Sequence, residues 1–307
     1  EVPVKLLGSL SLAFLLAGCG GASSTSGLES EAEAEAESEA EVAAAGVEAS
    51  IAFELAAGLD ATYCIETRLG NAAPLSVRRM TTSLSATSHH LIVYASNADE
   101  ERLEPFACDP FVGTASGESL PLMISQLGDE TLAFPDGVAY PVEAMQMVRL
   151  EMHAFNPSSE TARAEASVEF VGTDEPPDAL AGLLFYGTLD IYLVPGVDTV
   201  VGPVWMPVDA GAQVFAITGH THRWGTGVTV AMSAGATDEG VSLYEHADFD
   251  WEEPPTDWLE PHVAFADCEG FRFGCTYRND GEDIVEFGLS AEDEMCFLWA
   301  YYYPATG

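Results

Sequence analysis

The fold is decided by residues 147–154, which read MVRLEMHA. Apolar and polar side chains alternate from Val148 to Ala154, and His153 shares the polar side with Arg149 and Glu151. Because successive side chains of a strand project to opposite faces, the alternation predicts a β-strand with one apolar face. From about residue 51 onward the chain has the same texture of short alternating runs, broken by Gly, Pro, Asn and Asp. This texture predicts an all-β fold of the sandwich or barrel type.

The composition supports a packed core and excludes several classes of function. The chain has 307 residues, of which 48% are hydrophobic, so it is long enough for two domains and too apolar for global disorder. Its 50 acidic residues against 10 basic ones give a formal net charge of -40, which repels phosphate backbones and argues against nucleic-acid binding. Lys5 is the only lysine and lies in the expected export signal, so the mature chain lacks a lysine for a Schiff base or a phosphate-binding loop.

The first 50 residues are predicted to export and tether the protein. An apolar run behind Lys5 ends in Leu-Ala-Gly-Cys at residues 16–19, which resembles a bacterial lipobox, so residues 1–19 are predicted to be a lipoprotein signal with Cys19 lipidated. An ordinary signal peptide with a chance cysteine is the alternative. Residues 20–50 are rich in Ser, Gly, Glu and Ala, which predicts a disordered acidic tether or a single helix. We therefore expect an exported protein in the bacterial cell envelope, at the periplasm or cell surface, with membrane contact through its N-terminal lipid only.

Five of the seven histidines fall in three clusters within strand-like segments, namely His89-His90, His153 and His220-Thr221-His222. Residues two apart in a strand project to the same face, so His220 and His222 can hold one metal ion. Neutral imidazoles suit copper, zinc, iron or nickel, and the spacing alone leaves the metal open. Taken singly, each cluster is more often a set of core or surface histidines than a metal site.

The C-terminal segment points to one family. Residues 293–304, DEMCFLWAYYYP, are similar to the Glu-Met-Cys…Tyr-Tyr strand of dopamine β-hydroxylase and peptidylglycine α-hydroxylating monooxygenase. Further pieces resemble that family in its order and at similar separations: Tyr63-Cys64, His89-His90, Glu151-Met152-His153 with Asn156-Pro157, His220-Thr221-His222, and Cys275-Thr276-Tyr277. The chain thus resembles the copper type II ascorbate-dependent monooxygenases across about residues 55–304.

This resemblance implies an architecture and two ligand sets. The expected fold has two tandem antiparallel β-sandwich domains, jelly-roll-like, over residues 51–173 and 178–307, each carrying one copper ion and facing a solvent-filled cleft. The implied ligands of the electron-transfer copper are His89, His90 and His153. The implied ligands of the catalytic copper, which binds oxygen and substrate, are His220, His222 and Met295. A thioether is a soft ligand that favours Cu(I), so a sulfur ligand suits the oxygen site. From the residues alone, Met295 would be a core methionine, because it shares a face with Phe297, Trp299 and Tyr301.

The resemblance also assigns four of the six cysteines to disulfides. It pairs Cys64 with Cys108 and Cys275 with Cys296, and export beyond the cytoplasm permits such bonds. Strand alternation turns Cys296 to the face opposite Met295, so this bridge can brace the strand without competing for metal. Cys268 is left over, either as a thiol or as an alternative partner of Cys275 or Cys296.

The expected function is a copper-dependent monooxygenase that uses O2 and a one-electron reductant such as ascorbate to hydroxylate a C–H bond of a small-molecule substrate. Thr218 stands where the peptide-amidating enzyme has an arginine for the substrate carboxylate, and Phe297 replaces a polar residue, so a peptidylglycine substrate is disfavoured. One alternative is a non-catalytic copper-binding or copper-delivery lipoprotein on the same scaffold. A zinc-dependent envelope hydrolase also fits three-histidine sites but gives Met295 no role.

Overall fold

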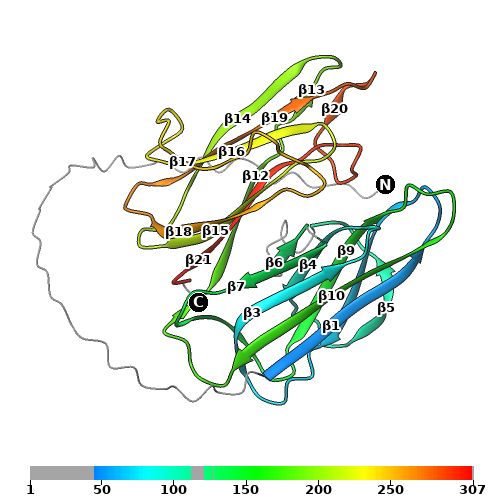
Figure 1. The fold of residues 1–307 in the computed structure, drawn as a ribbon, viewed down its shortest axis with the longest axis vertical. Coiled ribbons are helices and arrows are strands. Elements are labelled where there is room, and N and C mark those ends of the chain that lie inside the picture. Colours follow the sequence, from blue (N-terminus) through cyan, green and yellow to red (C-terminus); the bar gives the residue numbers. More distant parts are fainter. Residues whose placement is uncertain (1–44, 112–120, 127, 306–307) are drawn as a thin grey trace, which may run out of the picture. The chain divides into compact units, whose positions relative to one another are not determined.

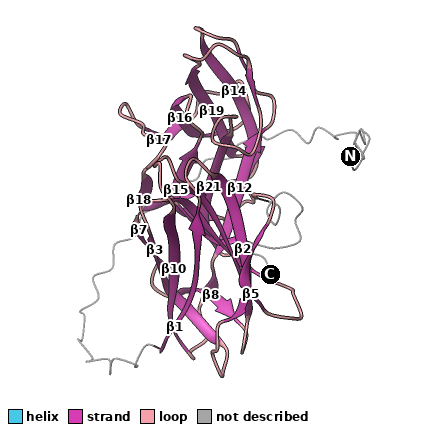
Figure 2. Cartoon of the chain, turned by 90° about the vertical axis from the view of Figure 1, so that its right-hand side faces the viewer, coloured by secondary structure: helices cyan, strands magenta, loops and turns pink. Residues whose placement is uncertain are grey.

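The computed structural model describes residues 45–111, 121–126 and 128–305, and every regular element within them is a β-strand, as Figure 1 and Figure 2 show. The all-β prediction is therefore confirmed. In these three ranges no helix has the length and apolarity needed to cross a membrane. The predicted signal peptide, Cys19 and the predicted tether as far as residue 44 lie outside the described residues.

The N-terminal sandwich is built from two sheets. The first sheet has the order β1-β10-β3-β8-β11, with β7 also paired to β3. Its strands are β1 (Ala45–Leu55), β3 (Leu75–Leu84), β7 (Asp129–Ala133), β8 (Val138–Val142), β10 (Ala162–Thr173) and β11 (Ala179–Leu180). The second sheet has the order β5-β2-β9-β4-β6. Its strands are β2 (Asp60–Arg68), β4 (Ser88–Ala95), β5 (Arg102–Ala107), β6 (Pro121–Ser125) and β9 (Met147–Phe155).

The C-terminal sandwich also has two main sheets, of four strands each. One has the order β12-β21-β15-β18 and consists of β12 (Gly182–Thr188), β15 (Gln213–His220), β18 (Thr256–Ala264) and β21 (Cys296–Tyr303). The other has the order β14-β19-β16-β17 and consists of β14 (Asp198–Pro207), β16 (Gly225–Ser233), β17 (Val241–Glu245) and β19 (Gly270–Arg278). A small ribbon pairs β13 (Tyr192–Leu193) with β20 (Val285–Glu286).

The two sandwiches have the same topology. Each has eight principal strands, which are β1, β2, β3, β4, β6, β8, β9 and β10 in the first sandwich and β12, β14, β15, β16, β17, β18, β19 and β21 in the second. Counted along the chain from 1 to 8, they form one sheet in the order 1-8-3-6 and another in the order 2-7-4-5 in both sandwiches. This is the jelly-roll arrangement of two Greek keys. The expected tandem of jelly-roll-like sandwiches is present, although no repeat is visible in the sequence.

The strands of the structure differ from the expected domain limits at two places. β1 begins at Ala45 and pairs with β10 along its whole length, so the expected limit after residue 50 cuts a strand. The sequence signal there is weak, because only Val47 and the small Ala49 face inward before Ile51. At the other limit, β11 pairs in parallel with β8, so the chain remains in the N-terminal sandwich as far as Leu180.

The two sandwiches share an apolar core. One cluster of buried side chains lies inside the C-terminal sandwich. A larger cluster fills the N-terminal sandwich and also includes Phe215, Trp299 and Tyr301 from the C-terminal sandwich. Polar contacts cross the same boundary, because the backbone N–H of Ile124 donates to the Tyr301 hydroxyl at 3.2 Å. The sheet that contains β15 and β21 is therefore covered by the N-terminal sandwich.

Both predicted disulfides are present. Cys64 is bonded to Cys108, and Cys275 is bonded to Cys296, which joins β19 to β21 across the two sheets of the C-terminal sandwich. Cys296 belongs to the inner apolar cluster of that sandwich, whereas Met295 belongs to the shared cluster, so the two adjacent side chains face opposite ways as expected. Cys268 is exposed and takes part in neither bridge.

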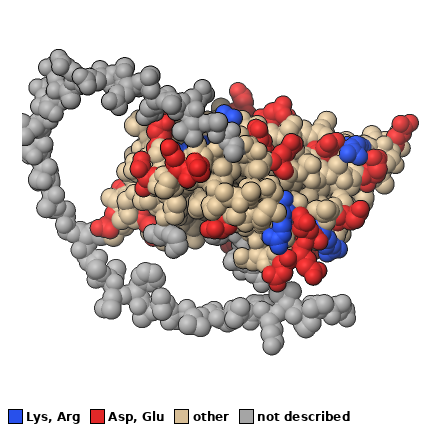
Figure 3. Space-filling model, turned by 90° about the horizontal axis from the view of Figure 1, so that it is seen from below, with Lys and Arg blue, Asp and Glu red and all other residues tan. Residues whose placement is uncertain are grey.

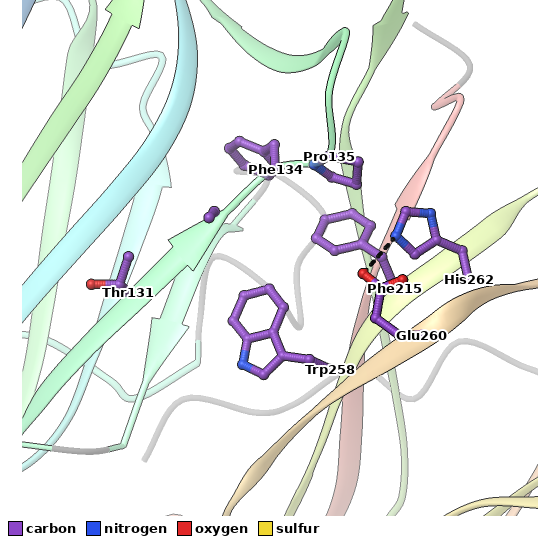
Figure 4. Close-up of a pocket in the computed structure, with 8 residues that line it drawn as sticks. Thr131, Phe134, Pro135, Phe215, Trp258, Glu260 and His262 are labelled. Carbon is purple, nitrogen blue, oxygen red and sulfur yellow. Dashed lines mark ion pairs between the residues drawn. The ribbon is translucent and has the colours of Figure 1, made fainter.

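The described surface carries mainly acidic charge. Figure 3 shows Asp and Glu side chains spread over one face, with few Lys or Arg among them. An aromatic cavity of about 420 Å³ lies where the sandwiches meet, lined by Phe134, Phe215, Trp258, Glu260 and His262 (Figure 4). The histidine pair at 89–90 and the His-x-His motif contribute no side chain to its lining.

Candidate metal centre

Three histidines of the N-terminal sandwich converge on neighbouring strands. His90 on β4 is the cross-strand partner of His153 on β9. A register shift between Ser88 and His90 marks a β-bulge, and a bulge can re-aim a side chain that regular alternation would turn away. His89 consequently joins the other two, with ring centroids 5.5 Å from His90 and 5.3 Å from His153. We call His89, His90 and His153 the first histidine group.

The nitrogens of the first histidine group fit a metal ion. One ligand atom from each residue lies within 4.8 Å of the others, and Nδ1 of His89 is 3.2 Å from Nδ1 of His90. Two nitrogens bound to one metal at about 2.0 Å are separated by about 3 Å, so this spacing is close to that of a coordination shell. Nε2 of His153 lies 2.5 Å from Oδ1 of Asp60. A carboxylate that accepts one ring N–H fixes the tautomer and leaves the other nitrogen, here Nδ1, for a metal.

Burial keeps the first histidine group in the form that binds metal. Burial, assisted by repulsion from neighbouring histidines, lowers the pKa of His89 to about 3 and that of His90 well below its ordinary value. Burial raises the pKa of Asp60, but the hydrogen bond and charge of His153 outweigh it, so the net shift is downward. The imidazoles of His89 and His90 are thus neutral at pH 7, as ligands must be.

A second group forms at one edge of the C-terminal sandwich. His220 ends β15, His222 follows it by two residues, and Met295 directly precedes β21, the strand paired with β15. The rings of His220 and His222 are 5.1 Å apart and nearly perpendicular. The three side chains are each 1% exposed. We call His220, His222 and Met295 the second group.

Glu294 ties the parts of the second group together. It is fully buried, and its carboxylate accepts the backbone N–H of His222 at 2.9 Å, of Trp224 at 2.6 Å and of Met295 at 3.2 Å. These bonds connect the loop that carries His222 to the residue before β21. Burial raises the pKa of Glu294 to about 7, although the backbone N–H donors around its carboxylate lower it. The carboxylate therefore holds the second group in place from behind.

The second group exposes the opposite ring nitrogens to a metal. Nδ1 of His220 is hydrogen-bonded to Oε1 of Gln126 from the N-terminal sandwich, and Nδ1 of His222 lies 3.3 Å from the carbonyl oxygen of Asp293. In both rings Nε2 therefore remains for a metal ion. Nε2 of His220 is buried with no hydrogen-bond partner among the described residues. Burial and neighbouring histidines lower the pKa of His222 to about 4 and that of His220 well below its usual range. Two neutral imidazoles suit copper, and a thioether from Met295 would add a soft ligand that favours Cu(I).

The two groups face each other directly. The ring centroids of His90 and His220 are 6.1 Å apart, and Phe111 packs against both, at 5.0 Å and 5.9 Å. Glu151 holds Phe111 by accepting its backbone N–H at 2.7 Å. This contact differs from the solvent-filled cleft that the family resemblance implied, because apolar rings from both sandwiches close over the histidines. It also explains why the polar side of β9 is buried, with Glu151 at 0% and His153 at 2% exposed.

Four residues of the centre have no role predicted from sequence. Trp251 belongs to the centre because its ring centroid lies 5.6 Å from that of His89. Asp60, Gln126 and Trp251 are single residues from separate loops or strand ends, and no local pattern marks them. Glu294 is part of the C-terminal motif, and its position directly before Met295 could have indicated a role in the site. The two histidines outside the three clusters, His246 and His262, are half-buried and contact Asp257 and Tyr303.

Comparisons with known proteins identify the C-terminal region. The chain is similar to the major capsid protein P2 from bacteriophage PM2, with a TM-score of 0.38, 9% identity, and 86% of this chain and 98% of that chain covered. It is also similar to a chain in the structure of Sulfolobus turreted icosahedral virus, with a TM-score of 0.23, 7% identity, and 84% and 57% covered. Both likenesses are too weak to inform function. Residues 203–307 match the model of the copper type II ascorbate-dependent monooxygenase C-terminal domain, which includes His220, His222 and Met295. This match over residues 203–307 supports a relation to the copper type II ascorbate-dependent monooxygenase family.

Proposed function

We propose that the protein is a copper monooxygenase that inserts one atom of O2 into a C–H bond of a small-molecule substrate, with electrons from ascorbate or a similar one-electron reductant. One observation carries the proposal: the first histidine group and the second group meet at the His90 and His220 rings, with Phe111 packed against both, in a chain whose C-terminal region matches the family's C-terminal domain. A zinc hydrolase would use one such group and would leave Met295 without a role.

The assignment of ligands follows from the available donor atoms. We assign one copper ion to the first histidine group and a second, catalytic one to the second group. Copper, when bound, supplies one-electron redox chemistry and the activation of O2. A soft thioether at the second group favours the reduced ion, whereas three imidazoles suit a site that cycles electrons.

The surrounding residues orient the ligands and exclude water. Asp60 and Gln126 each hold one ring tautomer, and Glu294 fixes the backbone that presents His222 and Met295. Phe111 and Trp299 place apolar rings within 6.0 Å of the His220 ring and keep solvent from it. The contact between the His90 and His220 rings sets the two ligand sets side by side, which suits electron transfer between them.

The burial of the second group favours one other candidate function. Side chains that are each 1% exposed suit a site that retains its metal, so a non-catalytic copper-binding or copper-delivery protein on this scaffold is the second candidate. The two candidates differ in oxygen consumption, since a binder needs no reaction with O2.

We also propose an exported location. Two disulfides are typical of oxidising compartments, and a lipid at Cys19 would hold the protein at the bacterial cell envelope. Mass spectrometry of the protein from its native host would find a diacylglyceryl group on Cys19 if this is correct and an unmodified thiol if it is not.

Metal analysis and oxygen uptake test the function together. The copper-loaded protein should hold two copper ions per chain and consume O2 in the presence of ascorbate once a substrate is supplied from an untargeted mixture. With labelled O2, one labelled oxygen atom should appear in the product. A protein that binds copper but transfers no oxygen to any compound would be the binder, and an outright preference for zinc would contradict both candidates.

A further inference from the structure

An acidic cavity lies beside the first histidine group. It has a volume of about 420 Å³ and is bordered by His89, Gln126 and three carboxylates, Asp250, Glu252 and Glu253. We propose that this cavity, which we call the acidic vestibule, is the route by which a copper ion reaches the first histidine group. The inference rests on the proposed function, because it takes copper as the metal.

The two walls of the acidic vestibule have different chemistry. The N-terminal sandwich supplies the turn of residues 84–89 together with Phe155 and Pro157. The C-terminal sandwich supplies the carboxylates from the loop between β17 and β18. No Lys or Arg from the described parts of the chain lines the cavity, and none of the three carboxylates forms an ion pair with a described residue. The cavity therefore carries negative charge without a compensating cation.

A cavity lined by charges of one sign concentrates counter-ions. Fields of this kind raise the rate of association of oppositely charged species by about 10-fold to 1000-fold, and the effect falls with ionic strength. Carboxylate oxygens are also weak ligands for copper compared with imidazole, so they can attract the ion without retaining it. The three carboxylates are exposed, whereas the histidines behind them are not, which gives a gradient from weak to strong ligands.

The inner end of the vestibule is a residue that can bind metal. His89 lines the cavity and belongs to the first histidine group, and its Nε2 is buried without a hydrogen-bond partner in the described structure. His90 and His153, at 1% and 2% exposed, lie behind it. A copper ion that enters the vestibule therefore meets His89 before the other two ligands.

Trp251 provides a signal for the arrival of the ion. It lies between Asp250 and Glu252 in sequence, and its ring is 5.6 Å from that of His89 at an angle of 32°. Copper bound at His89 should quench the fluorescence of this ring. Trp299 is 6.0 Å from His220, so copper in the second group will quench a different tryptophan. The difference between the wild-type protein and Trp251→Phe isolates the signal of the first histidine group.

The test follows the uptake of copper(II) ions by the full metal-free chain. The protein is mixed rapidly with copper(II) at low and high ionic strength, and the Trp251 signal is recorded. We expect the triple variant Asp250→Asn, Glu252→Gln, Glu253→Gln to take up copper about 10-fold more slowly at low ionic strength, within the range for electrostatic steering. Its final copper content should equal that of the wild type. High salt should slow the wild type toward the variant.

A matched control separates the vestibule from the net charge of the protein. Glu100, Glu104 and Glu239 are exposed and do not line the cavity, so their triple change to Gln removes the same number of charges elsewhere. Equal slowing in both triple variants, or no slowing in either, would overturn the vestibule. A wild-type protein that holds no copper at equilibrium would overturn the proposed function as well. Thermal melting checks that the variants fold, and the single changes Glu252→Gln and Glu253→Gln should each give part of the effect.

Discussion

The two sandwiches have one topology but use it differently. In the N-terminal sandwich, the ligand candidates lie on β4 and β9, which belong to the sheet of order 2-7-4-5. In the C-terminal sandwich they lie at the ends of β15 and β21, in the sheet of order 1-8-3-6. The centre is therefore not a repeated motif, because equivalent strands carry different roles. It forms where the sheet of order 2-7-4-5 in the N-terminal sandwich meets the sheet of order 1-8-3-6 in the C-terminal sandwich.

His153 differs from the two histidines of the second group in the ring nitrogen that is left for a metal. Asp60 binds Nε2 of His153, whereas Gln126 and the Asp293 carbonyl bind Nδ1 of His220 and His222. The outer hydrogen bond of a histidine thus decides which nitrogen faces the metal. Residue type alone does not distinguish the groups, but their hydrogen-bond partners and the sulfur of Met295 do.

Removal of one histidine tests whether the groups are independent. His153→Ala takes one ligand from the first histidine group, and we expect bound copper to fall from two ions per chain toward one. Metal analysis after gel filtration measures this, with His246→Ala as a control outside both groups. Loss of both ions in a protein that is still folded would mean that the groups bind copper as one unit.

The thioether is expected to matter for reactivity more than for metal content. Met295→His should keep copper near two ions per chain, because imidazole also binds copper, but should abolish most ascorbate-dependent O2 consumption. Met295→Leu preserves the packing and removes the ligand, so it should lose copper from the second group. If Met295→Leu keeps full copper content and activity, the methionine serves only as packing in the shared core.

The outer hydrogen bonds should each affect one group only. Asp60→Asn should weaken copper binding at the first histidine group by about 10-fold to 100-fold, and Gln126→Leu should do the same at the second group. Competition with a copper chelator, followed through the Trp251 and Trp299 signals, measures the two affinities separately. Equal weakening of both sites by either change would argue that the contact between the groups couples them.

The smallest expected effect is a dependence of stability on pH without metal. Burial lowers the pKa of four imidazoles, those of His89, His90, His220 and His222. Below about pH 6.5 the unfolded chain binds protons at these groups and the folded chain does not, so stability falls as the pH falls. Burial raises the pKa of Glu151 and Glu294 to about 7, which acts in the opposite direction between their ordinary value and pH 7.

The effect of the four imidazoles on stability outweighs that of the two carboxyl groups. We therefore expect the metal-free protein to lose roughly 1–3 kcal/mol of stability between about pH 6.5 and pH 5. Urea unfolding at a series of pH values measures this loss. Bound copper should reduce the slope. A metal-free protein that is equally stable at both pH values would show that the buried imidazoles take up protons as readily as exposed ones.

The sequence was sufficient to predict strands but not to predict the contact between the two sandwiches. Alternation over residues 147–154 predicts β9 and the side on which His153 lies. It does not predict that this side is buried, because the covering rings come from the other sandwich. Alternation would also separate the adjacent His89 and His90, and the β-bulge that unites them leaves no mark in the sequence. Asp60 and Gln126 come from distant segments, so their roles appear only in the folded chain.

The apolar cluster that spans both sandwiches has a consequence for modularity. Phe215, Trp299 and Tyr301 are buried by side chains of the N-terminal sandwich, so a fragment consisting of the C-terminal half would present these rings to water. We therefore expect that the region that matches the family domain does not fold on its own. Heating should unfold the two sandwiches in a single calorimetric transition, and neither should be obtainable as a soluble piece without its neighbour.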